Sequence, residues 1–157
     1  MYKKAQAAME FLMTYGWAIL VVLVAVGALA YFGVLNPGKF LPSSCTIGPG
    51  LACGEFKVTT GTANNTQIYV RNGLGKNIQA ISMSLTPADT SVTCINATGY
   101  SQPTSINDGA QALFVFDCSL GSASVGDRFK ATITFTYTAS GETMAHTMTG
   151  DITTKVE

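Results

Sequence analysis

Hydrophobic residues are gathered at one end of the chain. The run from Phe11 to Leu35, FLMTYGWAILVVLVAVGALAYFGVL, contains 25 residues and no charged side chain. About 20 apolar residues are enough for a helix to cross a bilayer. Asn36-Pro37-Gly38 then form a cluster that ends helices. A surface helix of a globular protein would have a polar face, which this run lacks. The pattern therefore predicts one hydrophobic helix that enters a membrane.

The remainder of the chain has the alternation of β-strands. Residues 129–138 place Phe, Ala, Ile, Phe and Tyr on one face and Lys and Thr on the other, and residues 144–156 alternate as well. Shorter candidates are 56–60, 67–71, 78–85, 92–95 and 112–117, separated by Asn-Gly, Asp-Gly and Ser-Gly turn signals. About seven short strands predict an antiparallel sandwich of immunoglobulin-like size. A small β-barrel is the alternative. The predicted fold class is α+β, a long N-terminal helix followed by this β domain.

Composition and charge argue against several functions. Charged residues make up 11% of the chain and the formal net charge is zero, so no basic face for nucleic acid is expected. The sequence contains no G-x-S-x-G nucleophile motif and no P-loop. The single histidine, His146, is in phase with Met144 and Met148, which favours a half-buried structural side chain over a general base. We therefore expect no enzyme activity, no cofactor and no metal.

Four cysteines follow the hydrophobic run: Cys45, Cys53, Cys94 and Cys118. An even number of cysteines beyond a membrane segment is typical of disulfides in an oxidising exterior. Three pairings are open, of which we favour Cys45–Cys53 and Cys94–Cys118. Each bond would stabilise the fold by roughly 2–4 kcal/mol. A zinc site is the competing interpretation, but the spacing lacks the usual close ligand pair.

Two triplets fit the acceptor pattern for N-linked glycans. They are Asn64-Asn65-Thr66 and Asn96-Ala97-Thr98. Such triplets also arise by chance in a domain rich in Asn and Thr. Asn64 and Asn96 are therefore candidate glycosylation sites on a translocated domain.

The extreme N-terminus departs from an ordinary secretory signal. Lys3-Lys4 and a small residue precede the hydrophobic run, and no small-residue cleavage site follows it. The stretch KKAQAAMEFLMTYGWAILVV resembles the class III signal of archaeal type IV prepilins, with Ala8 where the pattern often has Ser. The resemblance covers residues 3 to about 35. It implies cleavage by a prepilin peptidase between Ala5 and Gln6, and hence a leader (1–5), a hydrophobic helix (6–36) and an extracellular β domain (37–157).

The resemblance also implies a function and partners. The chain would be a subunit of an extracellular filament. The resemblance favours an adhesion pilin, because motility subunits usually lack the Gln6-to-Glu10 start. It would rest in the cytoplasmic membrane before assembly, interact with an assembly platform, and polymerise with its own kind through the helix. Glu10 would pair with the new amine of Gln6, its own or a neighbour's; alternatively, it only marks the helix start in the headgroup layer. The alternative functions are a membrane-anchored minor pilin or surface binding module and, less favoured, an anchored exoenzyme.

Overall fold

The structure is a computed structural model that describes residues 2–31, 42–63 and 65–157, with helix side chains described from Met9 onward apart from Leu12. The chain divides into two units, Met1–Leu41 and Pro42–Glu157. The described part of the first unit is one helix, and the strands belong to the second. The protein is therefore mostly β, with an apolar helix preceding antiparallel sheets.

The N-terminal helix, α1, runs from Tyr2 to Tyr31 over 30 residues. Its Ala, Leu, Met, Lys and Gln residues are good helix formers, and no proline interrupts it. The helix begins before Gln6, so the predicted leader residues 2–5 are continuous with it. The predicted end of the helix near residue 36 lies outside the described residues.

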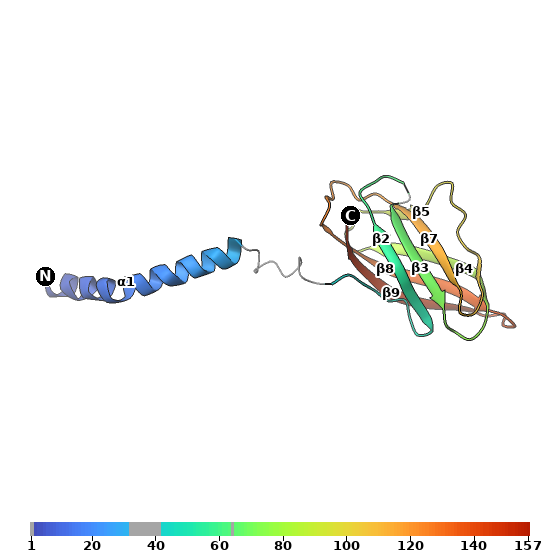
Figure 1. Cartoon of the computed structure of the whole chain (residues 1–157), viewed down its shortest axis with the longest axis horizontal. Helices are drawn as coiled ribbons and strands as arrows, with labels where there is room; N and C mark the ends of the chain where they lie inside the picture. Colours follow the sequence, from blue (N-terminus) through green and yellow to red (C-terminus); the bar gives the residue numbers. More distant parts are fainter. Residues whose placement is uncertain (1, 32–41, 64) are drawn as a thin grey trace. The chain divides into compact units, whose positions relative to one another are not determined.

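The second unit contains two antiparallel sheets (Figure 1). One has the strand order β1-β9-β8-β4-β6 and the other the order β2-β3-β7-β5. The strand bounds are β1 Ser44–Cys45, β2 Leu51–Val58, β3 Thr66–Asn72, β4 Ile78–Pro87, β5 Cys94–Asn96, β6 Ser105–Ile106, β7 Gln111–Cys118, β8 Arg128–Ala139 and β9 Ala145–Lys155. The hairpin β8–β9 forms the longest ladder, from Arg128↔Lys155 to Thr138↔Ala145.

A single apolar core lies between the two sheets. The alternation predicted for β8 is confirmed, because Phe129, Ala131, Ile133, Phe135 and Tyr137 are each at most 5% exposed. The ring of Phe114, from β7 in the other sheet, meets Phe135 edge-on with centroids 5.8 Å apart. Such aromatic contacts add to the stabilisation from apolar burial. The inward faces of the two sheets therefore pack together.

Three features of the β unit differ from the sequence prediction. The two-residue strands β1 and β6 were not expected, and β2 begins at Leu51 rather than near residue 56. A register shift between Cys53 and Phe56 interrupts the alternation of β2, which is why its first half has no strand pattern. The phase of β9 is correct, but Met144 lies beyond the core and is 74% exposed. Correct alternation thus predicts which face of the strand a residue lies on. It does not predict how far along the strand the core extends.

Candidate functional site

The surface of α1 is the most unusual feature of the described chain. Its segment Met13–Tyr31 is long and apolar enough to cross a membrane, and none of it is buried by the rest of the described structure. Met13 is 80% exposed, Trp17 67% and Leu23 67%. Soluble proteins rarely leave apolar patches of this extent in water. A helix with this surface is stable where water is excluded from it.

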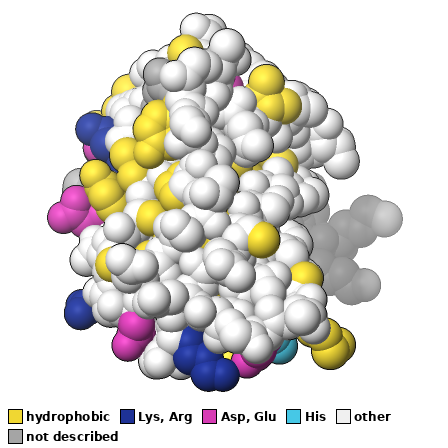
Figure 2. Space-filling view, turned by 90° about the vertical axis from the view of Figure 1, so that its right-hand side faces the viewer, with side chains coloured by type: hydrophobic (Ala, Val, Ile, Leu, Met, Phe, Trp, Pro, Cys, Tyr) yellow, Lys and Arg dark blue, Asp and Glu magenta, His cyan; other side chains and the backbone are white. Residues whose placement is uncertain are grey.

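The β unit is different in this respect. Its large hydrophobic side chains that are exposed in the described structure are Ile95, Val125 and Met144, on three separate segments. On the face shown in Figure 2, hydrophobic side chains occur mostly in small groups among other side chains and backbone atoms, with most charged side chains toward the lower and left edges. Isolated exposed hydrophobic residues are normal for a soluble domain. The extended exposed apolar surface of the described chain is therefore on α1.

Glu10 is the charged residue at the start of the apolar segment. It is exposed, and the Thr14 hydroxyl donates a hydrogen bond to its backbone oxygen at 2.8 Å. Phe11 and Tyr15, one helical turn apart, contact each other with ring centroids at 4.8 Å. Among the side chains that the structure describes, no cation lies within ion-pair distance of the Glu10 carboxylate.

The predicted cleavage site, Ala5–Gln6, lies within the first turns of α1. The side chains of both residues are outside the described part of the helix. Helix ends open at low free-energy cost, so a peptidase can act on this bond when the first turns unwind. The assignment of the site stays a prediction from the sequence.

The four cysteines form two disulfides, Cys45–Cys53 and Cys94–Cys118. These are the pairs favoured from the sequence. The first bond joins β1 to β2 and therefore links the two sheets, whereas the second joins the neighbouring strands β5 and β7 of one sheet. Two disulfides are typical of proteins in oxidising compartments outside the cytoplasm. An apolar N-terminal helix is typical of a signal sequence or a membrane anchor.

The two glycosylation triplets differ in accessibility. Asn64 lies outside the described residues, but Thr66 of its triplet is fully buried at the start of β3 and donates a hydrogen bond to the Asn65 side chain at 3.3 Å. Asn96 and Thr98 are both exposed, where β5 ends. An oligosaccharyltransferase acting on the folded domain would reach the Asn96 triplet more readily. Glycosylation at either position stays a prediction.

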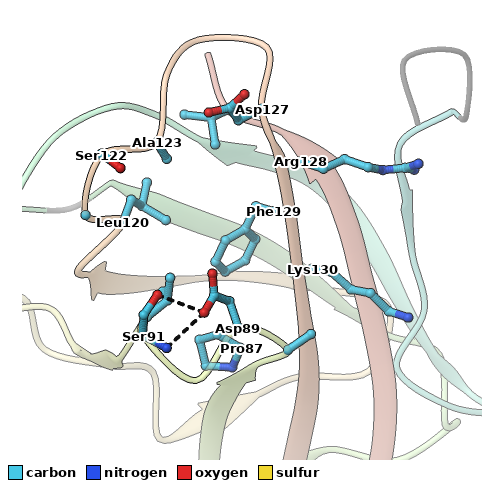
Figure 3. A pocket seen from close by; sticks show the side chains of 14 residues that line it. Pro87, Asp89, Ser91, Leu120, Ser122, Ala123, Asp127, Arg128, Phe129 and Lys130 are labelled. Atoms are coloured by element: carbon cyan, nitrogen blue, oxygen red, sulfur yellow. Dashed lines mark hydrogen bonds between the residues drawn. The ribbon is translucent and has the colours of Figure 1, made fainter. Parts of the chain in front are cut away.

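A surface pocket of about 750 Å³ is open to solvent at the ends of β4 and β8. Asp89 lies in it below Phe129, while Arg128 and Lys130 extend away from Asp89 (Figure 3). The Ser91 backbone N–H and hydroxyl donate to the Asp89 carboxylate at 2.9 and 2.8 Å and hold its pKa below the ordinary value. Asp89 therefore closes a turn, as Asp commonly does.

A polar cluster occupies the tip of the β8–β9 hairpin. Glu142 accepts a hydrogen bond from the Lys76 ammonium at 2.9 Å and pairs with His146 Nε2 at 2.8 Å. His146 also stacks on Tyr137, with ring centroids 5.5 Å apart, and burial raises the pKa of Tyr137. His146 was expected to be half-buried, and its side chain is 47% exposed. The sequence did not bring Lys76 and Glu142 together because they come from separate turns.

We predict that Glu142→Gln lowers the stability of the folded chain slightly at neutral pH. The hydrogen bond from Lys76 is the main cause that holds the pKa of Glu142 below its ordinary value, followed by that from His146. A lowered pKa stabilises the fold above the unfolded pKa, and this contribution is lost as the pH falls through the folded pKa. The difference between variant and wild type should therefore shrink below about pH 4. Thermal melts of both chains in detergent from about pH 3 to about pH 7 test this; a difference that stays constant across the range would contradict it.

Among the described residues, no group of three or more His, Cys, Asp or Glu side chains is arranged to hold a metal ion. In comparison with known proteins, no family model, curated protein or solved structure matches the chain. The function proposed below therefore depends on the N-terminal sequence pattern and on the geometry of the chain itself.

Proposed function

We propose that this chain is a structural subunit of an extracellular type IV pilus-like filament that serves surface adhesion. The subunit waits in the cytoplasmic membrane and is trimmed between Ala5 and Gln6. It then polymerises through α1, with the β unit outside. It carries out no chemistry of its own.

The observation that carries this proposal is the uncovered apolar surface of α1. The β unit has its own closed core, so it does not need the helix in order to fold. A helix that is apolar on all sides is stable only where water is excluded. Bundling many copies at the centre of a filament would bury this surface once the subunits leave the lipid. A head-to-tail contact repeated without closure produces an open helical polymer.

The N-terminal residues add specificity to the proposal. A plain membrane anchor requires neither a small residue before the apolar run nor an acid at its start. Ala5, Gln6 and Glu10 stand in the register of a class III prepilin signal. In a filament core, Glu10 would pair with the N-terminal amine of Gln6, which offsets the cost of burying its charge. Charge pairing would then set the axial register between neighbouring helices.

We further propose that the β unit has an immunoglobulin-like arrangement. One sheet has the order β2-β3-β7-β5, and the other contains the consecutive strands β9-β8-β4. If β2, β3, β4, β5, β7, β8 and β9 are lettered A to G, these orders become ABED and GFC, the constant-type pattern. The two-residue strands β1 and β6 are then additional edge strands. This correspondence supports the arrangement. Sandwiches of this type present loops at both ends, which suits an outward-facing adhesive domain.

A second candidate is a membrane-anchored minor pilin or surface binding module that does not form the bulk filament. The length of Met13–Tyr31 favours it equally, because 19 residues suffice to cross a bilayer. The two candidates differ in where the helix finally resides. In the first it lies inside a polymer, and in the second it stays in lipid.

Mass spectrometry of purified surface filaments tests the proposal. We expect the chain to be abundant in the filaments, with an N-terminal peptide that begins at Gln6. A chain recovered only from the membrane fraction would favour the anchored module. Filaments that contain the β unit without α1 would contradict polymerisation through the helix.

We predict that Glu10→Ala leaves membrane insertion intact but lowers filament yield severalfold. Removing a carboxylate makes the helix start more apolar, so insertion is not impaired. The proposed pairing with the Gln6 amine is lost, and the buried amine is left without a partner. Quantitative blotting of membrane and filament fractions measures both effects. Met9→Ala, at the adjacent exposed position, is the control and should assemble normally; wild-type filament numbers from Glu10→Ala would exclude the registration role.

A further inference from the structure

The chain enters the β unit through a short segment with few backbone contacts. Any tension on α1 must reach the β unit through Pro42, where the second unit begins. The strand that follows, β1, makes only two residue pairs, Ser44↔Thr153 and Cys45↔Ile152, with β9. A ladder this short offers little resistance by itself. Load arriving at β1 therefore needs another route into the fold.

The residues after β1 are tied to β9 and to the core. Thr46 donates its backbone N–H to the Asp151 carbonyl oxygen at 2.9 Å, and Ile47 is 1% exposed. Before β1, the Ser43 hydroxyl accepts a hydrogen bond from Thr154 at 3.3 Å. If the tension on β1 exceeded what the ladder with β9 withstands, these contacts would be lost with it. Residues 46–50 would then extend, and the pull would reach the first pairs of β2, Leu51↔Asn72 and Ala52↔Arg71.

The direction of the load follows from the strand directions. β1 is antiparallel to β9, and β9 begins at the β8–β9 hairpin tip. Tension between the N-terminal side of β1 and the hairpin tip therefore acts along the strands. Under this geometry the hydrogen bonds of the ladder are sheared together rather than opened in turn. A second attachment point at the hairpin tip therefore applies the load along β1 and β9 when α1 is pulled.

The Cys45–Cys53 disulfide, hereafter the entrance disulfide, bypasses the weak segment. Its first cysteine is in β1 and its second in β2, where Cys53 pairs with Val70 of β3. Because β1 and β2 belong to different sheets, the bond connects the arriving chain to both. The Cys94–Cys118 bond has no such position, since it joins neighbours within one sheet.

We infer that the entrance disulfide transmits axial tension from α1 directly into β2 and β3 and keeps residues 46–50 and the first two residues of β2 from extending. This mechanical role is a property of the single chain. Only its physiological use, in a filament that adheres under flow, rests on the proposed function.

Single-molecule force spectroscopy on the full chain in detergent tests the inference. One handle is attached at the N-terminus and the other at an azide-bearing residue in place of Met144, which is exposed at the hairpin. In Cys45→Ser/Cys53→Ser we expect an additional early extension that the oxidised wild type lacks. The bond spans 8 residues with Cα atoms 5.7 Å apart. At about 3.5 Å per extended residue, its loss releases about 22 Å once the first two residues of β2 have also opened. Stretching of α1 occurs in every variant and cancels in the comparison.

The matched control is Cys94→Ser/Cys118→Ser, which also removes one disulfide but should show no early step of this length. If Cys45→Ser/Cys53→Ser does not fold, reductant is added to this control variant while it is held at constant low tension, and the same step should then appear. Identical early extension with and without the entrance disulfide would overturn the inference. So would a step of equal length on loss of either bond. Neither result depends on whether filaments form, which the filament mass spectrometry tests separately.

Discussion

Gly150→Ala is expected to destabilise the β unit by about 3 kcal/mol, a large effect for one added methyl group. Gly150 lies in β9 opposite Ile133 of β8, and the segment after β1 crosses directly over it. A Cβ built at this position would lie 2.0 Å from the Thr46 carbonyl oxygen and 2.5 Å from the Ile47 Cα. Both atoms belong to the backbone, so no side-chain rotation relieves the clash. Either β9 or the crossing segment must move.

The crossing segment is the part expected to move, because β9 is held by its long ladder with β8. Its displacement would break the hydrogen bond from Thr46 to Asp151 and withdraw Ile47 from the core. Thermal and denaturant unfolding of the full chain in detergent measures the loss. Hydrogen exchange should rise most in residues 44–51.

Gly61→Ala is the matched control, because the atom nearest to an added Cβ there is 3.9 Å away and belongs to a side chain. It should change stability by well under 1 kcal/mol. A Gly150→Ala chain as stable as this control would mean that the crossing segment does not pack on β9 as described.

The sequence predicted those parts of the fold in which one face is buried along a whole strand. Residues 129–138 were predicted as a strand, and β8 covers Arg128–Ala139 with the expected face inward. Period-two alternation is informative there because a one-residue slip would expose every apolar side chain. The helix was equally predictable, since a long uncharged apolar run has few alternative structures.

The parts that were not predicted are fixed by contacts between distant segments. Two residues are too few to show a period, so β1 exists because β9, Gly150 and the entrance disulfide hold it. The same reason applies to Asn65, which is 1% exposed although Asn and Thr in such a run indicate a surface turn. Its side chain donates to the Cys118 carbonyl at 2.6 Å and accepts from the Cys118 N–H at 2.9 Å. Local patterns cannot report a partner 53 residues away.

The candidate site was predictable in a different sense. The apolar surface of α1 is a property of composition, so it could be identified without any fold. Glu10, Ala5 and Gln6 were singled out by their register with a family pattern, and their roles stay predictions.

Val22→Asp is expected to abolish filaments, with a yield at least tenfold below wild type. Val22 lies near the middle of Met13–Tyr31 and is 59% exposed. A carboxylate at the centre of a membrane helix raises the free energy of insertion by about 3 kcal/mol. In a bundle of apolar helices it would be a buried charge without a partner, which is also strongly destabilising. Insertion of the helix into the membrane and its packing in a bundle are therefore both disfavoured. Quantitative blotting of membrane, filament and soluble fractions measures the result.

Two controls separate the helix surface from the change in chemistry. Val125→Asp makes the same substitution at a position in the β unit that is 72% exposed, and it should leave membrane retention and filament yield unchanged. Val22→Leu keeps the position apolar and should also behave as wild type. Normal filaments from Val22→Asp would mean that subunits contact one another through the β units, with the helix surface outside the polymer. If Val22→Asp abolished filaments but the chain stayed fully in the membrane, the charge would be tolerated in lipid. The substitution would then act by disrupting the packing of helices against one another.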